Sequence, residues 1–130
     1  MRTLHSTLAG SLLLAIAFGA GAQTVVTHPG VTRASGDVRD VYIGEKQFVG
    51  AVKLVPVDNG TAQEKFLAAV VKVDVAKYNA IWTKKSFREG LSQPAAKSGD
   101  AEVLDFVRKT PGAVGYVGDA SKASGVNVVK

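Results

Sequence analysis

The sequence predicts a single α/β domain in which a mixed sheet is flanked by about three to four helices. The chain has 130 residues, no cysteine and 46% apolar residues, which is the length and composition of one globular domain. After residue 22, valine far outnumbers leucine, a composition that favours strands. Several segments nevertheless place apolar residues three and four positions apart, as amphipathic helices do.

Residues 1–22 have the three parts of a cleaved secretory signal. A basic start with Arg2 precedes the apolar run Leu12–Phe18, and small residues follow up to Ala22. The run is too short to span a bilayer. The alternative is a buried N-terminal helix, which the glycines after the run would break. We therefore expect a signal peptide over 1–22 and a soluble periplasmic domain over 23–130.

The first expected elements are a strand and a short helix. Residues 24–27 form an apolar stretch that favours a strand. Between residues 38 and 42 the apolar positions lie three and four apart, which predicts a helix. Either Ser35 or Asp37 is expected to cap its start, and Gly44 is expected to end it.

A turn, a strand and a second helix are expected next. Residues 47–50 are typical of a turn, and residues 52–57 of a strand. Thr61 and Glu64 have the spacing of a capping box, in which each side chain binds a backbone amide at a helix start. The expected apolar face of this helix consists of Phe66, Ala69, Val70 and Val73.

Two further helices are expected over residues 76–87 and 101–109. The first places Tyr78 and Trp82 on one face, where we expect core residues, and Pro94 lies beyond its end. The second ends in a basic pair, which is favourable at a helix C-terminus. Its expected buried residues are Val103, Leu104, Phe106 and Val107.

The last part of the chain predicts a turn and two strands. Residues 110–112 read Thr-Pro-Gly, which suits a type II turn. A strand over 113–117 follows and contains Tyr116, which we expect in the core. The alternating residues 126–129 are typical of a final edge strand.

Charge and residue types exclude several functional classes. The net charge is +5, but the charges are interspersed, so we expect no nucleic-acid partner. Lys84, Lys85 and Arg88 form the densest cationic cluster, and they are either a cationic rim or a solvated helix face. His28 is the only histidine after residue 22, so we expect no metal site and no cofactor. Without a nucleophile and base pair, we expect no enzyme activity.

Four segments carry a resemblance to a known family. They are residues 37–44, which include Arg-Asp-Val-Tyr-Ile-Gly, then 54–57, 78–87, and 110–117 with Pro-Gly-Ala-Val-Gly-Tyr. In this order they resemble the phosphate-binding periplasmic proteins of ABC transporters, and most closely their short single-lobe relatives. The resemblance implies one lobe of a type II periplasmic-binding-protein fold. It also implies phosphate as ligand and an ABC permease or another envelope protein as partner.

The chain departs from this family in two respects. Full-length members close two lobes around the anion, whereas this chain is similar to the second lobe alone and provides one wall. The family also places an arginine just ahead of a polar turn in the second lobe, where it pairs with phosphate. Residues 55–58 read Val-Pro-Val-Asp here, and Asp58 would repel an anion.

The candidate ligand-binding residues are Asn59, Gly60 and Thr61. They lie at an expected helix start, where backbone amides and the helix dipole favour an anion. The alternative is that Thr61 and Glu64 only cap the helix.

Two functions follow from these observations. The first is that of a periplasmic protein that binds a small anion such as phosphate. The second is that of a single-lobe interaction or scaffold module that has lost its ligand and acts through protein contact or as a homodimer. The missing arginine favours the second function, and the start of the helix at Thr61 favours the first.

Overall fold

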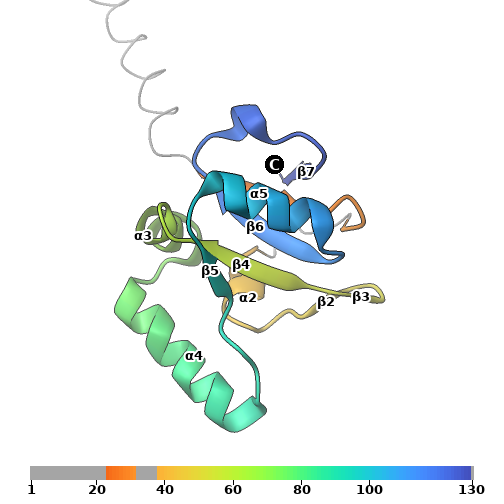
Figure 1. Cartoon of the computed structure of the whole chain (residues 1–130). Helices are drawn as coiled ribbons and strands as arrows, with labels where there is room; N and C mark the ends of the chain where they lie inside the picture. Colours follow the sequence, from red (N-terminus) through yellow and green to blue (C-terminus); the bar gives the residue numbers. More distant parts are fainter. Residues whose placement is uncertain (1–22, 32–37, 130) are drawn as a thin grey trace, which may run out of the picture.

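The protein is a mixed α/β structure, as the sequence predicts. A computed structural model describes residues 23–31 and 38–129 (Figure 1). The expected signal peptide and the expected caps Ser35 and Asp37 lie outside these residues. Within the described part of the chain, no helix has the length and apolar character needed to cross a membrane.

A five-stranded sheet with the strand order β5-β4-β6-β1-β7 forms the centre of the fold. Its members are β1 (Thr24–Thr27), β4 (Val55–Asn59), β5 (Ala95–Lys97), β6 (Ala113–Val117) and β7 (Asn127–Val129). Strands β5, β4 and β6 are parallel, whereas β1 is antiparallel to both β6 and β7. Strand β7 lies at an edge, as its sequence predicts.

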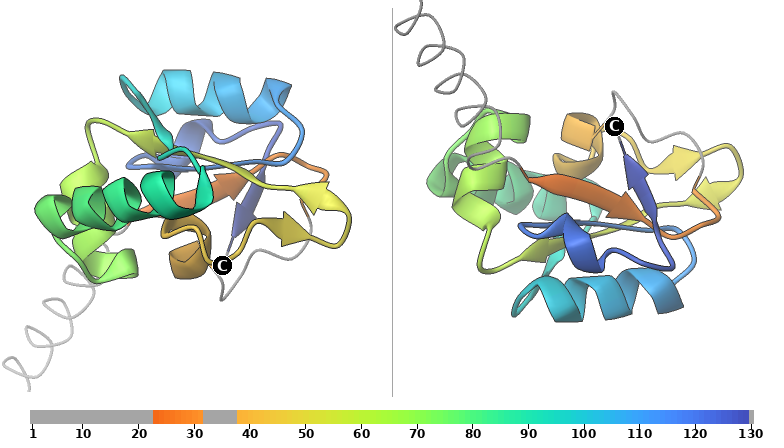
Figure 2. Two further views of the ribbon diagram at one scale, coloured as in Figure 1. Left: turned by 90° about the horizontal axis from the view of Figure 1, so that it is seen from below. Right: turned by 90° about the horizontal axis from the view of Figure 1, so that it is seen from above.

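Helices cover both faces of this sheet (Figure 2). Helix α5 (Asp100–Lys109) packs on one face against β6, β1 and β4. The other face carries α2 (Val38–Tyr42), α3 (Gln63–Phe66), the π-helical turn η1 (Leu67–Val71) and α4 (Val75–Glu89). Alternate residues of β1 point to opposite faces of the sheet. Val26 packs in the apolar cluster beneath α5, and Val25 packs in the apolar cluster on the other face.

An aromatic cluster holds the layer opposite α5 together. The rings of Phe66 and Tyr116 stack with centroids 3.7 Å apart, and the ring of Tyr42 meets both edge-on. The Tyr42 hydroxyl donates to the backbone oxygens of Val57 and Val114, which belong to β4 and β6. Tyr42 therefore fixes α2 to two neighbouring strands.

The expectations for α2, β1, β6 and the turn before β6 are confirmed. Gly44 follows α2 with a φ of 78°, as expected of a helix stop. Gly112 has a φ of 83°, and a Cβ atom there would lie 2.1 Å from the Lys53 backbone oxygen. Only glycine fits this turn, because both its conformation and its clearance exclude a side chain.

Two expectations about strands are wrong. Residues 47–50 are not simply a turn, because Phe48–Val49 forms β2 and pairs with β3 (Val52–Lys53) in a small hairpin. The expected strand over 52–57 is divided at Leu54, and its second half, β4, continues to Asn59. Strand β5 was not predicted, because three residues are too few to show a period.

The expected capping box is wrong, and the expected face of the second helix is confirmed in part, because Phe66 is buried and Val70 and Val73 are partly buried against the core. Helix α3 has Ala62 at its N-cap and no side-chain cap. The π-helical turn η1 then shifts the buried face, so that Leu67 and Val71 are buried while Ala69 is exposed. A π turn bonds residues five apart, so a pattern read at helical spacing loses its register there.

Candidate functional site

The candidate site lies where three parallel strands end on the same edge of the sheet. Strands β4, β5 and β6 run in the same direction, and their carboxyl ends lead into Gly60, Ser98 and Gly118. In open α/β sheets this edge is the usual place for a ligand. The structure places the sequence-predicted residues Asn59, Gly60 and Thr61 at this edge.

Asn59 organises this edge through its side chain, which is fully buried. Its Nδ2 donates to Asp100 Oδ1 at 2.7 Å and to the Tyr116 backbone oxygen at 3.0 Å. Its Oδ1 accepts hydrogen bonds from the Thr61 amide at 3.1 Å and the Thr61 hydroxyl at 2.8 Å. Asn59 thus closes a local turn and links β4 to α5 and β6.

Three successive backbone amides of the loop donate to groups of the protein itself. The Gly60 amide donates to the Lys97 backbone oxygen at 2.8 Å, and the Ala62 amide to the Asn59 backbone oxygen at 3.0 Å. The Thr61 amide donates to Asn59, as described above. A ligand would have to displace these bonds in order to use the amides.

Asp100 places a carboxylate of the protein at this edge. Its Oδ1 accepts from the Gly118 amide at 3.1 Å and its Oδ2 from the Asp119 amide at 3.0 Å, in addition to the bond from Asn59. Two backbone amides and one side-chain amide therefore converge on one carboxylate, which is how a protein binds an anion. The bonds of Asp100 to residues 18 and 41 positions away leave no local pattern in the sequence.

A second carboxylate, that of Asp58, lies buried immediately before the loop. The Tyr78 hydroxyl donates to Asp58 Oδ2 at 2.7 Å, and the Tyr116 hydroxyl donates to Oδ1 at 2.6 Å. Burial raises the pKa of Asp58, and the two tyrosine hydrogen bonds offset part of that rise. Burial and the nearby carboxylate also raise the pKa of both tyrosines. Tyr78 and Tyr116 lie in the core, as expected, and also bind Asp58.

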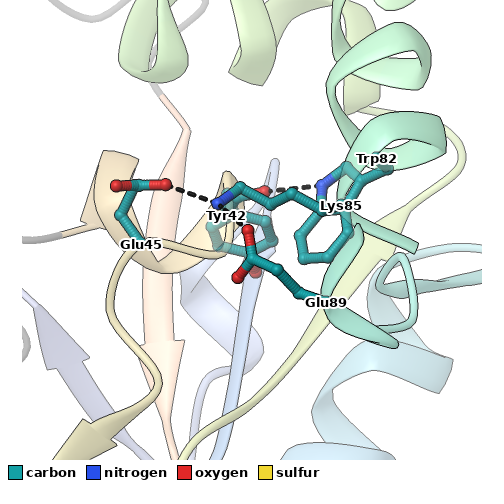
Figure 3. A network of polar contacts seen from close by, with 5 residues as sticks. All are labelled: Tyr42, Glu45, Trp82, Lys85 and Glu89. Atoms are coloured by element: carbon teal, nitrogen blue, oxygen red, sulfur yellow. Dashed lines mark hydrogen bonds and ion pairs between the residues drawn. The ribbon is translucent and has the colours of Figure 1, made fainter. Parts of the chain in front are cut away.

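The three residues of the possible cationic rim do not act as one group. Lys85 pairs with Glu45 and Glu89, and its side chain is only 15% exposed (Figure 3). The hydrogen bond from Lys85 lowers the pKa of Glu45. Lys84 and Arg88 are exposed on the outer face of α4. The expected rim is therefore reduced to two exposed cations.

Phe87 lies between these cations in sequence and is 93% exposed. Trp82, five residues earlier, is buried, and its indole Nε1 donates to the Tyr42 backbone oxygen at 2.9 Å (Figure 3). Of the three aromatic residues of α4, Tyr78 and Trp82 are buried and Phe87 is exposed. Helical spacing from Tyr78 and Trp82 puts residue 87 away from the buried stripe, so the sequence contained a signal for its exposure.

The described residues contain no group of three or more histidine, aspartate and glutamate side chains that could hold a metal ion. His28 Nδ1 accepts a hydrogen bond from the Gly30 amide.

A scan against models of known protein families finds no match for this chain. A search of curated proteins finds no match either.

Proposed function

We propose that this chain is an exported single-lobe module that acts by contact with another protein of the cell envelope. The observation that carries the proposal is Phe87, which is 93% exposed in the last turns of α4 and is flanked by Lys84 and Arg88. Aromatic side chains and arginine are enriched in protein interfaces and often supply most of the binding energy. An exposed phenylalanine beside two cations has the composition of such a contact.

The geometry of the strand ends favours a protein–protein contact rather than the binding of a small anion. Amides that would hold an anion there donate to Asn59, Lys97 and Asp100 instead. Asp58 adds a buried carboxylate next to the same loop. A single lobe also encloses a ligand from one side only.

The charge of α4 defines the chemistry of the partner. Two copies of α4 that met at Phe87 would bring Lys84 and Arg88 close to their counterparts, and like charges at an interface are unfavourable. An acidic segment that carries an apolar side chain would pair with the two cations and with Phe87. We therefore infer a different protein, rather than a second copy of this chain, as the partner.

Site-specific crosslinking in the native envelope tests this proposal. A photoreactive phenylalanine analogue placed at residue 87 should give one discrete adduct, to be identified by mass spectrometry. The same analogue at Asp105, which is exposed on α5 at the opposite face of the sheet, is the matched control and should give none. Adding Lys84→Glu and Arg88→Glu should remove the adduct, because both substitutions reverse the charge that attracts an acidic partner.

Measurements of the free energy of unfolding show whether Phe87 contributes to a partner contact or to the stability of the fold. Phe87→Ser should leave the free energy of unfolding within about 0.5 kcal/mol of that of the native protein, because the side chain is exposed. Trp82→Ala should lower it by about 3 to 5 kcal/mol, because Trp82 is buried. Equal adducts at residues 87 and 105 would contradict the proposal.

Phosphate binding is a second candidate, and one observation favours it. The loop Asn59-Gly60-Thr61 lies at the common carboxyl edge of three parallel strands, where ligands bind in open α/β sheets. Calorimetric titration of the protein with phosphate and sulfate at low salt tests it. Stoichiometric submicromolar binding would favour this candidate, and absence of binding at millimolar phosphate would exclude it.

A further inference from the structure

A cleft of about 390 Å³ lies at the edge of the sheet, away from the candidate site. It opens beside the first half of β4, between the β2–β3 hairpin and the segment 90–95 that leads from α4 to β5. Strand β5 pairs with β4 only from Val57 onward, so Val55 and Pro56 pair with β6 alone. Proline has no N–H group, so this edge of β4 cannot form a complete ladder with a further strand.

The walls of this cleft are predominantly apolar. Val55, Pro56, Leu91 and Phe106 line it and are each half-buried. Trp82, which is 4% exposed, also lines it. Because the indole N–H of Trp82 is bonded to Tyr42, the ring offers the cleft an apolar surface.

The charges that line the cleft have one sign. Its lining includes Lys46 and Lys53 from the hairpin region, and no aspartate or glutamate of the described part of the chain lines it. Lys53 is exposed, so its ammonium group lies at the solvent side. An occupant with an apolar body and a negative end would complement this arrangement.

The geometry points to a binding site for a small amphipathic carboxylic acid, with an apolar body on the order of ten carbon atoms. The apolar body would lie against Val55, Pro56 and Trp82, and the carboxylate would lie near Lys53. A cleft of this volume is at the lower end of the range for small-molecule sites, which favours a single short chain or ring. A second copy of the chain is disfavoured, because the chain carries a net charge of +5 and the charged residues of the cleft are lysines. This site is separate from the contact proposed for Phe87.

Trp82 is the only tryptophan of the chain, so its fluorescence reports on the cleft directly. The purified protein is titrated with decanoate, decanol and decyltrimethylammonium, each below its micelle concentration. Decanoate should give a saturable change in Trp82 fluorescence. Decanol should bind about two- to fivefold more weakly, as expected for loss of one exposed ion pair, and the cationic compound more weakly still.

Two pairs of variants locate the bound acid. Lys53→Glu should weaken decanoate binding and leave decanol binding unchanged, whereas Lys122→Glu, an exposed lysine outside the cleft, should change neither. Ala95→Leu should abolish binding of both compounds, because Ala95 lines the cleft and the larger side chain fills it. Its neighbour Ala96 is exposed and does not line the cleft, so Ala96→Leu is the matched control. Thermal unfolding of each variant verifies that it is folded.

Three results would overturn the inference. One is equal affinity for the three compounds with no effect of Lys53→Glu, which shows non-specific adsorption. Another is the lack of any saturable change with decanoate. A third is a concentration-dependent dimer, detected by sedimentation, that Ala95→Leu abolishes and Ala96→Leu does not, because the cleft then holds a second copy.

Discussion

At the scale of single residues, Asp58 combines burial with negative charge. Both of its oxygens accept tyrosine hydroxyls, so its hydrogen bonding is satisfied, but desolvation still raises its pKa. The folded protein therefore binds the proton of Asp58 more tightly than the unfolded chain does. Its contribution to stability increases as the pH falls toward the pKa of an ordinary aspartate, and is lowest above the raised pKa.

The substitution Asp58→Asn should remove this pH dependence. Asparagine retains an acceptor for one tyrosine and offers its amide to the other, without a buried charge. Relative to the native protein, the variant should gain stability as the pH rises from about 4 to about 8. Denaturant unfolding across this range measures the difference. A difference that does not change with pH would contradict the assignment, and Asp105→Asn, at an exposed position, is the control.

Asp100 provides a second prediction at this scale. Replacing it with alanine removes the acceptor for the amides of Gly118 and Asp119 and for the side chain of Asn59. We expect a loss of about 1 to 3 kcal/mol in unfolding free energy, as for other hydrogen-bonded polar groups that lose their partner. Asp105→Ala in the same helix removes only an exposed pair with Lys109 and should cost less than about 0.5 kcal/mol. Equal losses in chemical denaturation would show that Asp100 does not organise the strand ends.

At the scale of elements, the π-helical turn after α3 ends in an unusual conformation. Lys72 follows η1 with a φ of 69°, and it is the only described residue other than glycine with a positive φ. The amides of Lys72 and Val73 both donate to the Leu67 backbone oxygen, at 2.6 and 3.2 Å. This closure ends the helix at Val71 and directs the chain toward α4.

Glycine at residue 72 should therefore stabilise the protein. The left-handed conformation costs a lysine about 1 to 2 kcal/mol, whereas glycine adopts it freely and loses part of that gain to chain entropy. We expect Lys72→Gly to raise the unfolding free energy by up to about 1 kcal/mol. The same substitution at Lys84, in the middle of α4, should lower it by about 1 kcal/mol. Thermal or denaturant unfolding of both variants decides the matter, and a loss at residue 72 would contradict the assignment.

Elements with a regular period were predictable from the sequence, and those without one were not. The helices α2, α4 and α5 and the strands β1 and β6 occur close to the expected positions, because their apolar residues repeat at helical or strand spacing. The turn η1 was not predicted, because its buried residues Leu67 and Val71 lie four positions apart, which is also the spacing of an α-helix. The two-residue strands β2 and β3 are likewise too short to show a pattern.

At the scale of the whole molecule, the sequence predicted that the loop Asn59-Gly60-Thr61 joins a strand to a helix, as it does between β4 and α3, but the hydrogen-bond partners of its amides were not predictable. Its amides bond to Lys97 and Asn59, and Asp100 binds amides that follow β6. These partners come together only when β4, β5 and β6 are assembled. Local sequence pattern predicts that a strand leads into a helix, but it does not predict which distant side chain reaches that junction.

The last prediction concerns residues 1–22 and the domain as a whole. Residues 1–22 have the sequence pattern of a signal that is removed on export, and a removed segment contributes nothing to the mature fold. A chain that begins at Gln23 should therefore unfold with a free energy within about 0.5 kcal/mol of that of the full chain. Protein recovered from the periplasm should have the intact mass of residues 23–130, because the small residues before Gln23 suit signal cleavage. Folded protein that retains Met1 in the periplasm, or a large loss of stability on removal of residues 1–22, would show that this segment belongs to the domain.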